Sequence, residues 1–145
     1  MWQHEECVWG SLRVSTSDLL REEVNRVLKL GSVMVGTLQH EALVAFYEKV
    51  FEKPADMADQ ENGFAGWQVE GGFFGVLKHS EMGGKTKDPG RIMLNFETTE
   101  VAKEFERLKS VGAVVVREPY AIGEGLLATL ADPDGNYFQL VTPMG

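Results

Sequence analysis

His79 and Arg91 are side chains of this sequence that could carry acid–base chemistry, because an imidazole exchanges protons near neutral pH and a guanidinium stabilises an oxyanion. His79 has the same strand parity as Phe73 and Gly75, which places it at the rim of a cavity on that face. His40, where a strand pattern gives way to a helix pattern, is a second candidate base. The structural alternatives are a surface histidine at a strand end for His79 and a helix-starting residue for His40.

Other kinds of catalytic chemistry lack their motifs. Cys7 is the only cysteine, which excludes an intrachain disulfide and zinc patterns built from paired cysteines, and no G-x-S-x-G is present. Gly123–Ala128 matches the dinucleotide pattern G-x-G-x-x-A, but a β-rich stretch follows it, so we interpret it as a hairpin. Lys85, Lys87 and Arg91 form a basic patch without the spacing of a phosphate-binding loop, which is typical of a solvated linker.

Composition sets the class of protein. The chain has 145 residues, 43% of them hydrophobic and 25% charged, as in an ordinary globular domain. Its formal charge of −8 disfavours nucleic acid and anionic membranes as partners. No stretch has the length or apolarity of a signal peptide or a membrane span. We expect a cytoplasmic protein, a location that the single cysteine also suits.

Residues 1–31 differ in pattern from the rest and are predicted to form an N-terminal extension with one helix, capped by Ser17 and ended by Gly31. A strand over 32–38 and a helix over 40–53 follow. Two further strands, 63–69 and 72–79, are separated by Glu70 and Gly71 and predict a hairpin. The weakly patterned stretch before them leaves a third strand uncertain.

The same order returns after a Gly-, Lys- and Pro-rich linker over 80–90. A strand is predicted over 91–97 and a helix over 98–112, capped by Thr98 or Thr99 and ended by Gly112. The three strands after it are predicted at 113–119, 125–131 and 136–142.

A gapless shift of 59 positions matches Met34 with Met93 and Phe46 with Phe105, and a shift of 64 places GGFFGVL over GNYFQLV. Strand, helix and final strand therefore recur in order, which indicates an internal duplication. We predict an α+β domain over 32–145, made of β-α-β-β-β modules at about 32–80 and 91–142.

The closing stretch ADPDGNYFQLV combines a tight turn at Asp132–Gly135 with an alternating strand. Phe138 and Leu140 share the face that packs on a helix, while Tyr137 and Gln139 share the other. With the tandem modules and FYEKVF, this stretch resembles the vicinal oxygen chelate superfamily, which includes glyoxalases, bleomycin resistance proteins and dihydroxybiphenyl dioxygenases. The resemblance implies a curved, partly open mixed sheet around a cavity.

Metal-using members of that superfamily hold a divalent ion with His or Glu residues from the first and last strands of the modules. Transferred by the resemblance, those positions fall on Ser32, Gly75, Arg91 and Gln139. These residues supply no imidazole and no carboxylate, and the Arg91 cation would repel the ion. We therefore predict no cofactor and no metal at the usual place. A divalent ion bound by non-standard ligands, Gln139 among them, is the alternative.

The resemblance and the strand parity together predict a cavity for a planar or amphipathic organic molecule, lined by Met34, Trp67, Phe73, Arg91, Met93, Asn95, Tyr137 and Gln139. Our first hypothesis is a metal-independent binding protein that sequesters a cationic or aromatic compound, as acidic homodimers of the superfamily do. The alternative is a glyoxalase-type lyase, isomerase or dioxygenase with an atypical metal site. A dimeric scaffold that binds through residues 1–31 is a third possibility.

Overall fold

The structure of the chain is a computed structural model that describes residues 28–143, and Ser32–Gly145 forms one compact unit. The helix predicted within residues 1–31 lies outside the described residues.

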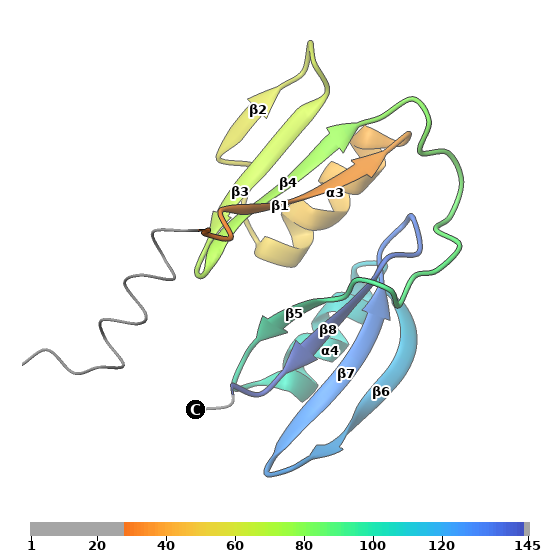
Figure 1. Cartoon of the computed structure of the whole chain (residues 1–145). Coiled ribbons are helices and arrows are strands. Elements are labelled where there is room, and N and C mark those ends of the chain that lie inside the picture. Colours follow the sequence, from red (N-terminus) through yellow and green to blue (C-terminus); the bar gives the residue numbers. More distant parts are fainter. Residues whose placement is uncertain (1–27, 144–145) are drawn as a thin grey trace, which may run out of the picture. The chain divides into compact units, whose positions relative to one another are not determined.

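The first module begins with β1 (Ser32–Thr37) and α3 (His40–Phe51) and continues with β2 (Met57–Asp59), β3 (Phe64–Val69) and β4 (Gly72–Lys78). Its sheet has the order β1-β4-β3-β2, with β1 parallel to β4 and the other pairs antiparallel. Figure 1 shows α3 crossing this sheet. The strand that the sequence left uncertain is the short β2.

The second module repeats this arrangement with β5 (Leu94–Glu97), α4 (Val101–Ser110), β6 (Val114–Ile122), β7 (Gly125–Ala131) and β8 (Tyr137–Val141). Its sheet order is β5-β8-β7-β6, and β5 is parallel to β8. The α+β fold of tandem modules is confirmed, as two open four-stranded mixed sheets. The glycine-rich match at 123–128 is a hairpin, because Ile122 pairs with Gly125 across its turn.

Strand pairing corrects the offset between the repeats. Met34 pairs with Gly75 and Asn95 pairs with Gln139. Since Gly75 and Gln139 are equivalent positions of the last strands, Met34 corresponds to Asn95, 61 positions away rather than 59. Thr98 corresponds to Thr37 by the same offset, and each hydroxyl accepts the N–H of the residue two positions on, at 3.0 Å. The offset of 59 differs because a gapless alignment of the two repeats maximises the number of identical residues. It takes no account of which strand residues pair in the sheets.

The predicted strand over 91–97 is too long at its start, because β5 begins at Leu94. Pro89 lacks an N–H, and the Arg91 N–H turns back to the carbonyl oxygen of Asp88 at 3.1 Å. This local turn competes with the strand. Arg91 therefore lies in the linker and forms an exposed ion pair with Asp88 at 3.6 Å.

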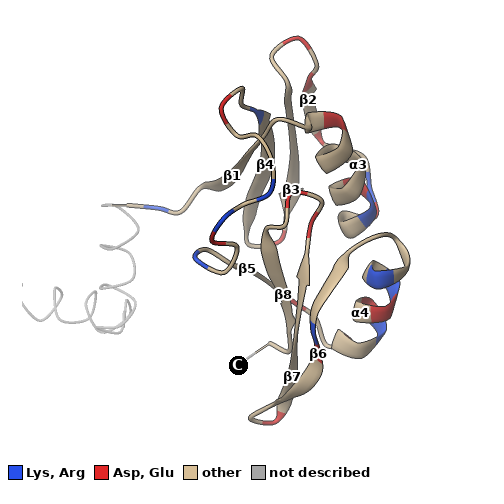
Figure 2. Cartoon of the chain, turned by 90° about the vertical axis from the view of Figure 1, so that its right-hand side faces the viewer, with Lys and Arg blue, Asp and Glu red and all other residues tan. Residues whose placement is uncertain are grey.

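Both helices cover the same side of the sheets, as Figure 2 shows. Phe138 and Leu140 face this side and are buried, as predicted, and each contributes about 2 kcal/mol by leaving water. Aromatic contacts cross between modules, from Phe46 to Phe138 and from Phe51 to Phe96. The largest fully buried side chains are Trp67, Tyr47, Phe138, Leu43, Leu108 and Leu130.

A buried hydrogen bond also joins the modules. The Tyr47 hydroxyl of α3 donates to Asp132 at 2.7 Å, in the turn between β7 and β8. The other donors to the Asp132 carboxylate are the Asp134 N–H and the N–H and side-chain amide of Asn136, at 2.9–3.0 Å. Burial raises the pKa of Asp132, and these hydrogen bonds oppose the rise. The closing turn is thus a structural junction.

Ionisation of Tyr47 should destabilise the protein in alkaline solution. Burial, and then the charge of Asp132, raise the pKa of Tyr47 well above its ordinary value of 10.0. Above about pH 10 the unfolded chain loses this proton while the folded chain keeps it, so stability falls by about 1.4 kcal/mol per pH unit. Urea unfolding between pH 8 and 11 measures the slope, and Tyr47→Phe should reduce it by this amount. An unchanged slope would contradict the assignment.

Among residues 28–143, no helix is long and apolar enough to cross a membrane.

Candidate functional site

A cleft of about 970 Å³ lies between the modules, where the β5 strand faces the β3–β4 hairpin and the end of α3. Its volume is within the range of small-molecule sites. β1 and β5 are edge strands of their sheets, which leaves this region open. The lining residues are Val33, Val50, Phe51, Glu52, Val69, Glu70, Gly71, Gly72, Phe73, Phe74, Leu94, Asn95, Phe96, Glu97, Thr98, Glu104, Arg107, Leu108, Leu140 and Pro143.

Aromatic rings form the apolar part of the cleft. Phe51 ends α3 and packs on Phe74 of β4 and Phe96 of β5, with ring centroids 5.6 Å apart in both pairs. Phe74 is buried, whereas Phe51 and Phe96 are half-buried. Leu94 and Phe96 face the helix side because β5 alternates. The cleft thus offers ring faces and edges to a planar molecule.

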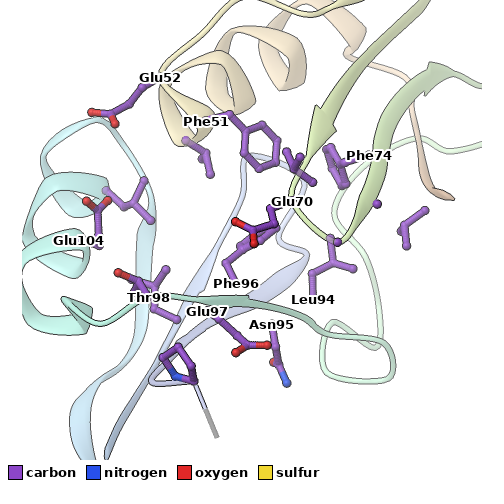
Figure 3. A pocket seen from close by; sticks show the side chains of 18 of the residues that line it. Phe51, Glu52, Glu70, Phe74, Leu94, Asn95, Phe96, Glu97, Thr98 and Glu104 are labelled. Carbon is purple, nitrogen blue, oxygen red and sulfur yellow. The ribbon is translucent and has the colours of Figure 1, made fainter. Parts of the chain in front are cut away.

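Carboxylates surround this apolar part, as Figure 3 shows for Glu52, Glu70 and Glu104. Glu97 also lines the cleft, on the opposite face of β5 from Phe96, so the lining holds four carboxylates and one guanidinium, that of Arg107. Arg107 is engaged by Glu104 at 2.6 Å and by Glu52 at 3.8 Å. Within residues 28–143, Glu70 and Glu97 have no cationic partner within 4.0 Å. The cleft is therefore electronegative, which favours a cationic ligand.

Arg107 holds one wall of the cleft in place. Its guanidinium donates to the carbonyl oxygens of Lys49 and Val50 at 2.7 and 2.9 Å, in the last turn of α3. A cation is favourable there because the end of a helix carries partial negative charge. One arginine of α4 thus joins the helices of both modules, which fixes Phe51 and Glu52 relative to β5.

The predicted cavity residues do not all line the cleft. Some lie on the open face of the sheets, and Phe73 on that face also reaches the cleft. Phe73 and Asn95 line the cleft. Met34 and Phe73 lie on the sheet face away from the helices, where a Cβ at Gly75 would meet the Met34 sulfur at 2.6 Å and one at Gly66 would meet the Phe73 ring at 2.2 Å. These glycines leave the room that both side chains fill.

Trp67 does not line the cavity, and this prediction is wrong. Its side chain is 0% exposed and packs on Tyr47 and Phe51 on the helix side of β3. The indole N–H donates to the carbonyl oxygen of Lys53 at 3.1 Å. Trp67 alternates with Gln68, which faces away from the core. The sequence alone does not determine which of these two residues faces the helices.

The predicted cavity residues of the second module lie either on the sheet face away from the helices or in the segment that precedes β5. The Gln139 side-chain amide donates to the Thr129 hydroxyl at 3.0 Å. Tyr137 is half-buried beside the linker, whereas Met93 is 42% exposed and precedes β5. Arg91 is outside the strand, so the structure does not place it next to Gln139 as the transferred metal positions required.

The residues present do not fit the divalent ion that the fold implies. Met34 and Phe64 occupy the space above Gly75, and Gln139 uses its amide on Thr129. A serine and an amide provide no charge to balance a dication. Between Leu28 and Pro143 the structure shows no group of three or more His, Cys, Asp or Glu residues that could hold a metal.

Neither candidate histidine lines the cleft. His79 follows β4, where its N–H donates to the carbonyl oxygen of Thr37 at 2.8 Å and its ring Nδ1 accepts the Glu81 N–H at 3.2 Å. His40 begins α3, and its buried Nε2 has no hydrogen-bond partner among the described residues. His79 therefore has a local role in a turn.

Sequence reasoning missed Phe51, Phe96, Glu70 and Glu97 as cleft residues. The sequence placed Phe96 and Glu97 in a strand and Glu70 in a hairpin turn, but no spacing brings these elements together. Their proximity results from the packing of one module on the other.

The fold and its closing turn define the class of protein. The sequence model of the family described as Glyoxalase-like domain matches residues 32–141, and the chain belongs to this family. The resemblance to the vicinal oxygen chelate superfamily is thereby confirmed. Comparison with curated proteins gave no match.

Solved structures share the fold. A glyoxalase-related enzyme from Fulvimarina pelagi is 24% identical with a TM-score of 0.67, over 82% of this chain and 94% of that one. A glyoxalase/bleomycin resistance protein/dioxygenase family enzyme from Burkholderia phytofirmans PsJN is 25% identical with a TM-score of 0.63, over 81% and 100%. The fosfomycin resistance protein FosX from Mesorhizobium loti is 17% identical with a TM-score of 0.62, over 81% and 93%.

Proposed function

We propose that this protein binds a small cationic aromatic molecule in the cleft between its modules and sequesters it without chemistry. The observation that carries the proposal is an aromatic interior, formed by Phe51 and Phe96, beside the Glu70 carboxylate, which has no cationic partner within 4.0 Å among residues 28–143. Rings stack on the apolar surface while the carboxylates attract the positive charge. The resistance functions in the names of structural relatives also support small-molecule binding.

Binding is proposed to be independent of metal. The family positions hold Ser32, Gly75 and Gln139, and the cleft needs no ion to attract a cation. We also propose that the protein acts as a homodimer in the cytoplasm. Apolar side chains left exposed on the strands, among them Met34 and the valines of β6, support self-association.

Titration with 9-aminoacridine, a planar aromatic cation, tests the proposal by fluorescence or calorimetry, with the neutral acridone as the matched compound. We expect 9-aminoacridine to bind and acridone to bind about fivefold more weakly, because a solvent-exposed ion pair contributes up to about 1 kcal/mol. Glu70→Gln should weaken 9-aminoacridine by about fivefold without lowering the melting temperature, since Glu70 is exposed. EDTA should have no effect.

Glu124→Gln is the matched control, because Glu124 is exposed in the β6–β7 turn and is not a cleft residue. An equal loss of affinity in the two variants would reduce the effect to net charge and overturn the cleft assignment. Loss of binding in EDTA would overturn metal independence, and conversion of the ligand would overturn sequestration in favour of catalysis. Light scattering on the same samples should give twice the mass of one chain.

A further inference from the structure

β6 departs from regular alternation at two places. Its pairing with β7 shifts between Val115 and Arg117 and again between Arg117 and Tyr120. Arg117 pairs with Thr129, and Tyr120 pairs with Leu127. Thr129 and Leu127 are two residues apart and share one face, so the irregularities bring Arg117 and Tyr120 to that face as well. In a regular strand, residues three apart would point to opposite faces.

Arg117 and Tyr120 stack on each other. The guanidinium carbon lies 3.6 Å from the centre of the Tyr120 ring. A stacked guanidinium keeps its N–H donors free along its edge, where they match the oxygens of a carboxylate. Within residues 28–143, no carboxylate lies within 4.0 Å of Arg117. The arginine is thus oriented by the ring and not neutralised.

The residues beside Arg117 form a polar row across the second sheet. Arg117 pairs with Thr129, Thr129 with Gln139 and Gln139 with Asn95, so all four share the face away from the helices. The Thr129 hydroxyl accepts from Gln139 at 3.0 Å and is buried, so it links the strands beneath this face. Asn95 and Arg117 are exposed at the two ends of this row and Gln139 is half-buried, so the guanidinium of Arg117 is open to solvent.

We propose that this face binds the carboxylate of a small organic acid, with Arg117 as the bidentate partner and Tyr120 holding the guanidinium. This site goes beyond the proposed function. It lies on a different face from the aromatic interior of the cleft, and Arg117 is three strands, roughly 14 Å, from the cleft residue Asn95. Each proposal can therefore fail without the other.

Titration of the full chain with benzoate, followed by amide ¹H–¹⁵N chemical shifts, tests the site against benzamide, which has the same shape without the charge. Benzoate should shift amides of β6, β7 and β8, and benzamide should not. Arg117→Gln should weaken benzoate by about tenfold or more. Arg117→Lys should weaken it about threefold to fivefold, because lysine keeps the charge but loses the planar fork and the stacking.

Arg91→Gln is the matched control, since it removes the same charge from an exposed arginine of the linker. It should leave benzoate binding and the melting temperature unchanged. Equal weakening by Arg91→Gln and Arg117→Gln would show a net-charge effect and overturn the site. Equal shifts by benzamide, shifts confined to other strands, or displacement of benzoate by equimolar inorganic phosphate would overturn the assignment to a carboxylate.

Discussion

Replacing Asp132 by alanine is expected to destabilise the protein by about 3–5 kcal/mol, since donors arranged around a buried acceptor would lose their partner. Asp132 is 2% exposed and accepts the Tyr47 hydroxyl from the first module. It also accepts the Asp134 N–H and both donors of Asn136 in its own turn. The substitution therefore damages the turn and the contact between modules together.

Urea unfolding of Asp132→Ala, followed by circular dichroism, measures this loss. Asp132→Asn keeps one acceptor oxygen and the shape of the side chain, so we expect an intermediate loss of about 2 kcal/mol. Asp88→Ala is the control, because it removes a carboxylate from the linker that is 70% exposed, and should change stability by less than about 0.5 kcal/mol. A loss below about 1 kcal/mol for Asp132→Ala would contradict its role at the junction.

Trp67→Ala is expected to cost about 3–5 kcal/mol, because deletion of a large buried ring removes its transfer free energy and leaves a cavity. The ring is 0% exposed, with neighbours on α3 and β4, and its N–H bonds the Lys53 carbonyl oxygen. Trp67→Phe should cost less, about 1–3 kcal/mol, since it keeps an aromatic ring and loses volume and one hydrogen bond.

Phe73→Ala distinguishes the two faces of the first sheet. Phe73 is half-buried on the open face, stacked on Phe64 and lying over Gly66. Its removal should cost about 1–2 kcal/mol, clearly less than removal of Trp67. If Trp67→Ala destabilised the protein no more than Phe73→Ala, Trp67 would belong to an open surface. That result would agree with the cavity position that the sequence predicts for it.

The closing turn and the strand after it can be predicted from neighbouring residues alone. Asp132, Pro133 and Gly135 determine a turn by backbone preference alone, and the strand after it alternates, so Phe138 and Leu140 were assigned to the core from the sequence. The order of strands and helices was predictable for the same reason. Each element depends on residues a few positions apart, and the duplication repeats them.

The sequence by itself determined the tandem modules, the closing turn and a set of family metal positions without the usual ligands. The tertiary structure decided which face Trp67 takes, the offset of 61 that separates Met34 from Asn95, and the placement of Arg117 beside Thr129. The cleft likewise exists because Phe51 and Phe96 meet across the modules. Strand register, bulges and module packing arise from contacts between distant residues, and no local spacing encodes them.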